Sequence, residues 1–322
     1  MTEVVFPLAG KRIWVAGHRG MVGAAISRRL EREDCRQILA GRESVDLTRQ
    51  AAVEEFLARE RPDAIFIAAA KVGGILANDT QPADFLYENL VIETNIINAA
   101  YHSSVGKLLL LGSSCIYPRL SPQPIIEAAL LTGPLEPTNE WYAIAKIAGI
   151  KLAQAFRKQH GTDFISAMPC NLYGPGDNFA PQTSHVLPAL IRKAHEAKLR
   201  GADSITLWGS GTPRREFMHA DDCADACIHL MKTYSDLEHV NVGSGEDMTV
   251  LELAQLVCRI VDFRGRIVTD TSKPDGTPSK LMSIDKLKGL GWAPSIDLQR
   301  GVEDSYRWFL DNVFAREERS PP

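Results

Sequence analysis

The sequence contains no apolar run that is long enough to cross a membrane. Its longest apolar stretches, 64–70 and 108–111, are far shorter than the roughly 20 residues of a spanning helix. Cysteine is scarce: six residues are scattered through 322, and no CxxC pair or histidine cluster accompanies Cys223 and Cys227. These absences argue against a membrane protein, a disulfide scaffold and a metal site, and favour packed, reduced thiols.

Basic charge is not in excess either, because the formal net charge is −4. A nucleic-acid partner is therefore not expected, and a phosphorylated ligand would have to be held by local arginines and backbone N–H groups. The first ten residues lack a charged start followed by an apolar run. We therefore expect no signal peptide and a cytoplasmic protein.

The N-terminal half alternates short apolar strands with helices. Strands are predicted at 12–16, 38–40, 64–70, 107–111 and 164–168, and helices at 21–32, 49–60, 85–101 and 141–160. Continuous apolar strands between helices indicate an α/β fold, a Rossmann-like doubly wound parallel sheet that binds ligands at the carboxyl ends of its strands.

The pattern becomes irregular after about Gly174. We therefore predict a dinucleotide-binding domain over residues 1–175. A smaller substrate-binding domain is predicted over 176–322, interleaved with the first.

Three glycines lie between the first strand and the first helix. Gly17 permits a tight turn, Gly20 allows the backbone to approach a pyrophosphate, and Gly23 allows the helix to pack closely on the strand. The spacing is GxxGxxG rather than GxGxxG, but the strand before it and the helix after it favour dinucleotide binding.

Two arginines point to the kind of dinucleotide. NAD enzymes place a carboxylate after the second strand, whereas here Arg42 follows that strand and Arg19 lies in the first loop. Both suit a 2′-phosphate, so the sequence favours NADP. The alternative is that Arg42 is merely solvated, and Asp46 close by weakens the NADP argument slightly.

Catalytic groups appear in a fixed order. Tyr142 and Lys146 form a YxxxK pair and share one helix face, so the ammonium can assist proton transfer by the phenol. Ser113, just after the fourth strand, adds a hydroxyl that can polarise the same substrate oxygen.

Several segments resemble the GDP-L-fucose synthases, within the extended short-chain dehydrogenase/reductase family. They are AGHRGMVG at 16–23, AAAKVGG at 68–74, LGSSCIYP at 111–118, YAIAKIAG at 142–149, NLYGP at 171–175, SHVLPAL at 184–190 and WGSGTP at 208–213. The resemblance implies a homodimer whose GDP-sugar substrate, GDP-4-keto-6-deoxy-D-mannose, is epimerised at C3 and C5 and then reduced at C4 with NADPH.

Epimerisation needs a base and an acid, because the C4 ketone acidifies the hydrogens on C3 and C5. The resemblance implies that Cys115 and His185 are this pair, and we favour Cys115 as the base. From the residues alone, a packing thiol and a helix-terminal histidine would be the simpler interpretations.

The remaining contacts also follow the resemblance. Substrate contacts are expected from Lys193, Trp208, Arg215 and Asp275. The expected cofactor contacts are Gly17, Arg19, Gly20, Met21, Val22, Gly23, Arg42, Leu47, Leu111, Gly112, Ser113, Lys146, Pro169, Asn171, Leu172 and His185.

Some positions depart from the family pattern, and other functions remain open. Cys170, Lys193 and Ser279 stand where threonine, arginine and a basic residue are expected. The alternatives are another extended-type nucleotide-sugar epimerase or reductase, and a catalytically silent NADP-binding sensor. The complete YxxxK pair argues against the sensor, and Ser114-Cys115 in place of an acidic pair argues against a 4,6-dehydratase.

Overall fold

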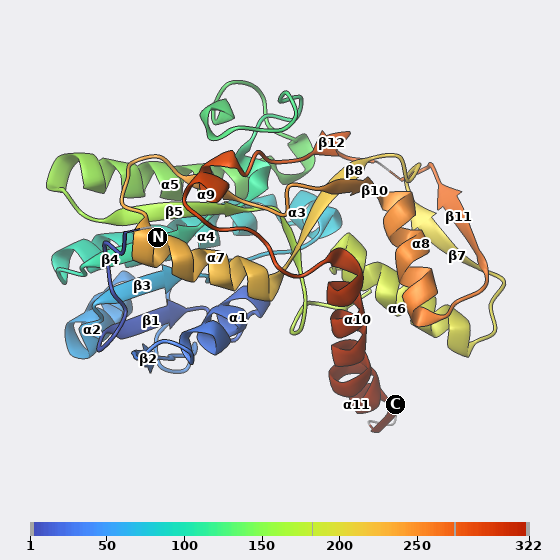
Figure 1. Cartoon of the computed structure of the whole chain (residues 1–322), viewed down its shortest axis with the longest axis horizontal. Helices are drawn as coiled ribbons and strands as arrows, with labels where there is room; N and C mark the ends of the chain where they lie inside the picture. The colour runs from blue at the N-terminus through green and yellow to red at the C-terminus, as the bar shows by residue number, and fades with distance from the viewer. Residues whose placement is uncertain (1–2, 182, 274, 320–322) are drawn as a thin grey trace.

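The computed structural model describes residues 3–181, 183–273 and 275–319, and its centre is a six-stranded parallel sheet (Figure 1). This sheet confirms the predicted Rossmann-like fold class. Its strands, in spatial order, are β2 (Arg36–Ile38), β1 (Arg12–Ala16), β3 (Ala64–Ile67), β4 (Lys107–Leu111), β5 (Phe164–Pro169) and β9 (Val240–Val242).

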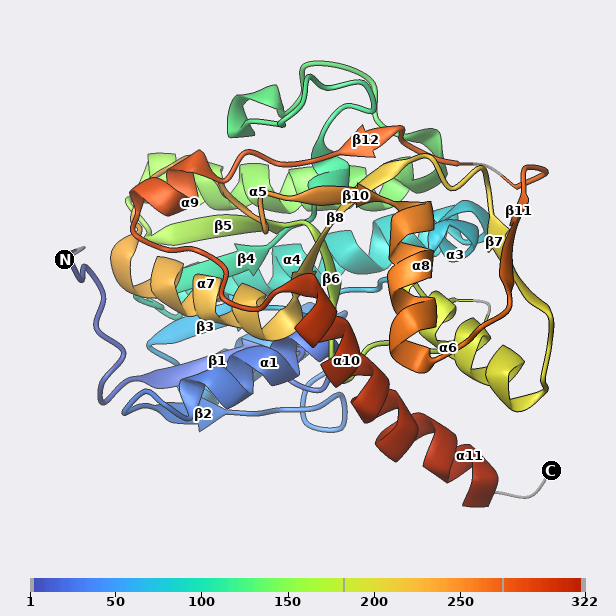
Figure 2. The same ribbon diagram turned by 45° about the vertical axis from the view of Figure 1, so that its right-hand side comes forward.

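Helices cover both faces of this sheet. One face carries α1 (Met21–Leu30) and α7 (Ala220–Thr233), and the other carries α2 (Gln50–Glu60), α4 (Pro82–His102) and α5 (Glu140–His160), as Figures 1 and 2 show. Every residue of β3 and β4 is buried, which explains why their sequences are continuously apolar rather than alternating.

A second, smaller part lies on the right in Figure 1 and has its own buried core. Its strands are β6 (Asn171–Tyr173), β7 (Ser204–Trp208), β8 (Arg214–His219), β10 (Asp247–Thr249), β11 (Arg266–Asp270) and β12 (Ser279–Lys280). Its helices are α6 (Val186–Leu199), α8 (Val250–Val261) and α10 (Leu298–Phe309). A capping box between Thr249 and Glu252 fixes the start of α8.

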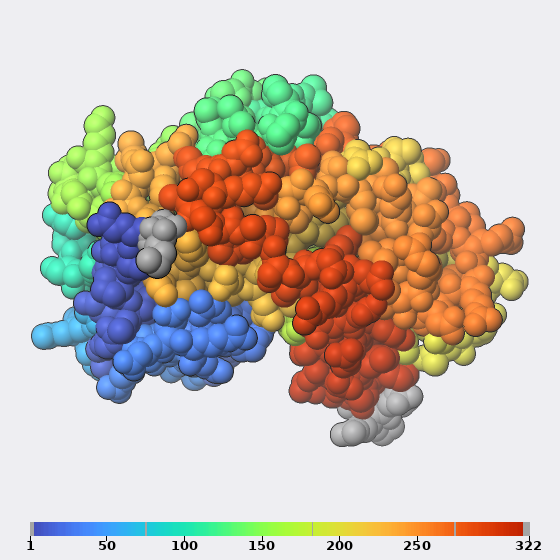
Figure 3. Space-filling model, in the orientation of Figure 1, coloured from blue at the N-terminus to red at the C-terminus, as the bar shows by residue number. Residues whose placement is uncertain are grey.

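The chain passes between the two parts several times. It leaves the large sheet after β5, because β6 pairs with β8, and it returns to supply α7 and β9 before entering β10. On the face shown in Figure 3, a notch separates the blue N-terminal part from the red C-terminal helices. Elements after residue 175 therefore complete the large sheet and one of its helical layers.

Several elements differ from the sequence prediction. The strand predicted at 38–40 is β2 at Arg36–Ile38, since the chain turns outward after Ile38 and leaves Leu39 half-exposed.

The elements that complete the fold are α3 (Ile75–Thr80), α9 (Asp285–Gly289), α11 (Ala315–Arg319), the 3-10 turns η1 (Ser114–Ile116), η2 (Glu127–Ala129) and η3 (Pro137–Asn139), and the π-helical turn η4 (Leu310–Phe314).

No helix formed by the described residues is both long enough and apolar enough to span a bilayer. The same residues contain no cluster of three or more metal-binding side chains. All six cysteines are free thiols.

Candidate active site

The glycine loop at the carboxyl end of β1 forms a tight cradle. Gly17 has φ +89°, and a Cβ there would fall 2.6 Å from the backbone nitrogen of Ala69. A Cβ on Gly23 would fall 2.1 Å from the carbonyl oxygen of Gly17. Gly20 is the N-cap of α1, whose first-turn N–H groups have no intrahelical partner. This backbone shape and the helix dipole fit the pyrophosphate of a dinucleotide.

The two arginines predicted to bind a 2′-phosphate follow neighbouring strands. Arg19 follows β1 and Arg42 follows β2, and both side chains are exposed. Glu43 also lies here, and its carboxylate accepts a hydrogen bond of 2.9 Å from Nη1 of Arg19. The sequence prediction did not include this carboxylate, which would compete with a phosphate for Arg19.

The YxxxK pair lies in the first half of α5. Lys146 is 2% exposed, and its Nζ lies 5.7 Å from the centroid of the Tyr142 ring. Burial raises the pKa of Tyr142 to about 12, and the opposing effects of Lys146 and the Ser113 hydroxyl do not cancel it. The tyrosine is therefore a phenol at neutral pH, which is the form that donates a proton.

Ser113 and Cys115 lie on one turn. Ser113 comes directly after β4, and its Oγ accepts a 3.4 Å hydrogen bond from the backbone N–H of Cys115. Cys115 is 6% exposed, and burial raises the pKa of its thiol, while the positive charge of Lys280 acts in the opposite direction.

His185 is the N-cap of α6. His185 is exposed as a residue, yet desolvation by the protein atoms around its imidazole lowers its pKa. The residues just before it dock on the loop after β3, where Gly74 N–H donates to the Thr183 carbonyl at 3.1 Å. In the part of the chain that the structure describes, no hydrogen bond joins Cys115 to His185.

The four predicted substrate residues lie close together in the smaller part. Nζ of Lys193 lies 4.8 Å from the centroid of the Trp208 ring, and burial lowers the pKa of Lys193. Nη2 of Arg215 donates to the Asp275 carbonyl at 3.3 Å. Asp275 in turn accepts from the backbone N–H of Ser210, two residues after Trp208, at 2.7 Å. The tryptophan face, two cations and a carboxylate thus form one cluster.

The other predicted cofactor residues lie at the ends of β4 and β5 and nearby. Leu111 ends β4, and a Cβ on Gly112 would fall 2.3 Å from Sδ of Met168. Pro169 ends β5. Asn171 and Leu47, which were also predicted to contact the cofactor, make hydrogen bonds within the protein. The Asn171 amide donates to the Glu216 carbonyl at 2.8 Å, and the Leu47 carbonyl accepts from Asn95 at 3.0 Å.

The sequence prediction missed three charged residues near these groups. Glu93 contacts Lys146 from α4. Glu136 is 8% exposed, with Oε2 lying 3.1 Å from Nε of Arg119. Lys280 pairs in register with Arg215 in the neighbouring strand. Each depends on contacts remote in sequence, so no local motif indicates them.

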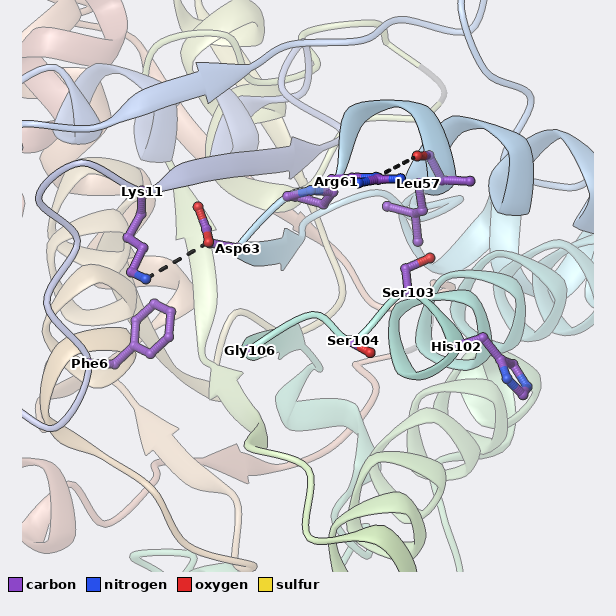
Figure 4. A pocket seen from close by; sticks show the side chains of 11 residues that line it. Phe6, Lys11, Leu57, Arg61, Asp63, His102, Ser103, Ser104 and Gly106 are labelled. Atoms are coloured by element: carbon purple, nitrogen blue, oxygen red, sulfur yellow. Dashed lines mark hydrogen bonds and ion pairs between the residues drawn. The ribbon is translucent and has the colours of Figure 1, made fainter.

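A separate cavity lies away from these residues. It is an open depression of about 560 Å³ beside Lys11, Asp63 and Gly106, the residues that immediately precede β1, β3 and β4 (Figure 4). It therefore lies at the amino ends of the strands, away from the glycine cradle. Parallel sheets bind their ligands at the carboxyl ends, and Lys11 is already paired with Asp63 at 3.8 Å. We assign no function to it.

Comparison with known proteins identifies the family. The NAD dependent epimerase/dehydratase family model matches residues 13–243. A GDP-L-fucose synthase from Sinorhizobium fredii is 61% identical to this chain, over 96% of the chain and 98% of its own length. The chain belongs to the GDP-L-fucose synthase family.

Solved structures extend the comparison. A GDP-L-fucose synthetase from Naegleria fowleri bound to NADP has 27% identity and a TM-score of 0.87, covering 96% of this chain and 97% of that one. A GDP-D-glycero-L-gluco-heptose synthase from Campylobacter jejuni, solved in the presence of NADPH, has 34% identity and a TM-score of 0.87, covering 94% and 98%. The GDP-L-fucose synthase fold thus also serves other GDP-sugars.

Proposed function

We propose that the chain converts GDP-4-keto-6-deoxy-D-mannose to GDP-L-fucose by epimerisation at C3 and C5 and NADPH-dependent reduction at C4. The observation that carries this proposal is the turn after β4. Ser113, beside the Tyr142–Lys146 pair, and the Cys115 thiol lie two residues apart on it. Groups for reduction at oxygen and for proton transfer at carbon can therefore reach one sugar ring.

The glycine cradle holds the cofactor in this proposal. The first turn of α1 binds the pyrophosphate, and Arg19 and Arg42 bind the 2′-phosphate that distinguishes NADP from NAD. When bound, NADPH supplies the hydride for C4. Lys146 holds the nicotinamide ribose in place.

Epimerisation comes first, while the ketone still acidifies its neighbours. Cys115, as thiolate, removes the hydrogen from carbon, and Ser113 and Tyr142 stabilise the enolate oxygen by hydrogen bonding. His185 then returns a proton to the opposite face, inverting the centre. The charges of Lys280 and Lys146 favour the thiolate against the effect of burial.

Reduction follows at the same oxygen. As hydride reaches C4, the developing alkoxide takes the phenolic proton of Tyr142, and the resulting phenolate recovers a proton from solvent. Ser113 polarises the C4–O bond, and Lys146 stabilises the phenolate transiently.

The Lys193–Trp208–Arg215–Asp275 cluster holds the GDP part of the substrate. Arg215 and Lys193 pair with the diphosphate, Trp208 supplies an apolar face, and Asp275 accepts a hydrogen bond from the nucleotide. In this proposal residues 176–322 supply most of the substrate binding, and residues 1–175 most of the cofactor binding.

A homodimer is also proposed, through α4 and α5. The outer faces of these adjacent helices carry large apolar side chains, since Tyr87 is 66%, Trp141 42% and Ile144 37% exposed. Burying them against the same helices of a second copy would remove these apolar side chains from water.

The decisive experiment supplies GDP-4-keto-6-deoxy-D-mannose and NADPH and identifies the product sugar by NMR. GDP-L-fucose is the expected product. Reduction without inversion at C3 and C5 would contradict the epimerase assignment. The GDP-heptose relative makes a 4-keto GDP-heptose the matched competing substrate, and exclusive turnover of that sugar would overturn the proposed substrate.

A further inference from the structure

A buried carboxylate that the mechanism above does not use lies directly beside the catalytic lysine. Glu93, in α4, is 1% exposed, and its Oε1 lies 2.8 Å from Nζ of Lys146 in α5. The same Nζ donates to the Leu111 carbonyl at 2.9 Å. An ammonium has three hydrogens, so these two acceptors fix its orientation and leave one N–H for other partners.

The local sequence of α5 makes room for this carboxylate. A Cβ on Gly149 would fall 2.0 Å from Oε2 of Glu93, so only glycine permits the observed approach. Oε2 is buried, and it makes no hydrogen bond within the described part of the chain. Lys146 is thus the one hydrogen-bond partner of the Glu93 side chain among the described residues.

Stability alone does not account for such a pair. Desolvating a carboxylate and an ammonium costs about as much as their attraction returns, and apolar replacements are often neutral or stabilising. A carboxylate that leaves one buried oxygen unpaired is a poor structural crosslink. Its location next to Lys146 points to an effect on the charge of that lysine instead.

We propose that Glu93 is a positioning residue that balances the charge of Lys146 and so keeps Tyr142 as a neutral phenol, ready to donate its proton in reduction. This inference rests on the proposed role of Tyr142 as the proton donor. An unbalanced lysine would favour the phenolate, which suits a dehydrogenase that removes a proton from an alcohol. The Glu93–Lys146 pair therefore biases a shared catalytic apparatus toward the reductive direction.

The charged and titratable groups around Tyr142 come from α4, α5 and the turn after β4, and their effects are consistent with this proposal. Burial raises the pKa of Tyr142, Lys146 in α5 lowers it, Cys115 in η1 and Glu93 in α4 raise it, and Ser113 after β4 lowers it. Burial lowers the pKa of Lys146, but Glu93, Tyr142 and Cys115 together raise it overall. Burial raises the pKa of Glu93, and the positive charge of Lys146 and its hydrogen bond oppose that effect.

The direct test measures the ionisation of Tyr142 in the free enzyme. Tyrosinate absorbance is followed against pH, and the signal of Tyr142 is isolated by subtracting the same titration of a Tyr142→Phe variant. In the wild-type protein no ionisation of Tyr142 is expected up to about pH 10. In Glu93→Gln it is expected about one pH unit or more below its wild-type position.

Matched variants separate this effect from general damage. Glu93→Asp keeps the charge and should restore the wild-type titration at least in part. Glu33→Gln removes a half-buried carboxylate remote from the site, which pairs with Arg29 at 3.0 Å, and should leave the titration unchanged. Gly149→Ala, whose methyl group would displace the Glu93 carboxylate, should reproduce Glu93→Gln. It provides the test if Glu93→Gln does not fold, because alanine favours the helix.

Activity gives a second, independent readout. The alkaline limb of the pH profile for NADPH oxidation should move down by the same interval in Glu93→Gln, while deuterium uptake at C3 and C5 persists. Identical tyrosinate titrations in wild type and Glu93→Gln would overturn the inference. If the proposed function itself were wrong, the wild type would not reduce the keto sugar at any pH, yet the titrations would still differ.

Discussion

The carbonyl oxygen of Gly17 lies so close to Gly23 that a Cβ at Gly23 would fall 2.1 Å away from it. The loop and the first turn of α1 are therefore in direct backbone contact, with no space for a methyl group. This contact fixes where the N–H groups of the helix point, and it gives the first prediction.

Gly23→Ala should weaken NADPH binding by about 1–3 kcal/mol or more, because the added methyl group forces the loop away from α1. Isothermal titration calorimetry would measure the loss. Gly289→Ala is the control, since a Cβ there meets nothing within 4 Å. Unchanged NADPH affinity in Gly23→Ala would show that the cradle does not hold the pyrophosphate.

Cofactor preference should depend on Arg19 and Arg42. Replacing both with alanine should weaken NADPH binding about 10–100-fold and NADH binding much less, since only NADPH offers a 2′-phosphate to their charges. Glu43→Gln should act in the opposite direction, because it frees Arg19 from its carboxylate partner. Equal losses for the two cofactors in the double variant would refute the assignment.

Reduction and epimerisation should separate in Tyr142→Phe. This variant keeps the ring but has no phenolic proton, so hydride transfer should fall by roughly 10²–10⁴-fold. Deuterium uptake from solvent at C3 and C5 should survive at least in part, and NMR measures it. Near-normal NADPH oxidation would mean that another group donates the proton.

Cys115→Ser should show the reverse pattern. Serine keeps the shape of the side chain, but its hydroxyl is too weak an acid to be deprotonated at working pH and so cannot act as the base. Deuterium uptake should therefore be abolished. Ser113, Tyr142 and Lys146 remain, and the unepimerised ketone should be reduced to a GDP-rhamnose-type product. If this variant makes GDP-L-fucose at the normal rate, Cys115 is a packing residue.

The free energy of unfolding should decrease as pH rises from 4.5 to about 6, because Glu216 loses its proton in this range. Burial raises the pKa of this fully buried carboxyl from 4.5 to about 6, although the N–H groups of Gly245 and Met282 oppose the shift. The folded state therefore binds the proton of Glu216 more tightly than the unfolded state does. The contribution of this carboxyl to the free energy of unfolding decreases by about 2 kcal/mol as pH rises from 4.5 to about 6. Urea unfolding across this range should be less pH-dependent in Glu216→Gln, and identical slopes would contradict the assignment.

The sequence predicts the first part of the fold well because its signals are local. Fully buried strands such as β4 are apolar throughout, and the glycine cradle and the YxxxK pair each lie within a few residues. The smaller part was harder to predict. β8 begins with Arg214, Arg215 and Glu216, a charged run typical of a loop. Its charges are satisfied by partners far along the chain, as when Arg214 pairs with Asp247.

Part of the candidate site could not be predicted for the same reason, because it depends on contacts between residues that are far apart in the sequence. Lys146 is recognised by its spacing from Tyr142, but its partner Glu93 lies 53 residues away on another helix. Gly149, three residues after Lys146, is glycine because a Cβ there would clash with the Glu93 carboxylate. The sequence does not reveal this reason, because the clash depends on how α4 packs against α5. Cluster members such as Lys193 and Asp275 were expected from family resemblance, whereas their proximity depends on tertiary contacts.

The repeated passage of the chain between its two parts constrains how such enzymes exchange specificity. A recombination event with one junction after β5 would bring in a donor's sugar-binding elements together with its α7 and β9. The donor's α7 would then have to pack against the recipient's α1, and its β9 would have to pair with the recipient's β5. Substrate preference and the surface of the cofactor domain are therefore inherited together. A chimera that transfers one without the other needs several junctions.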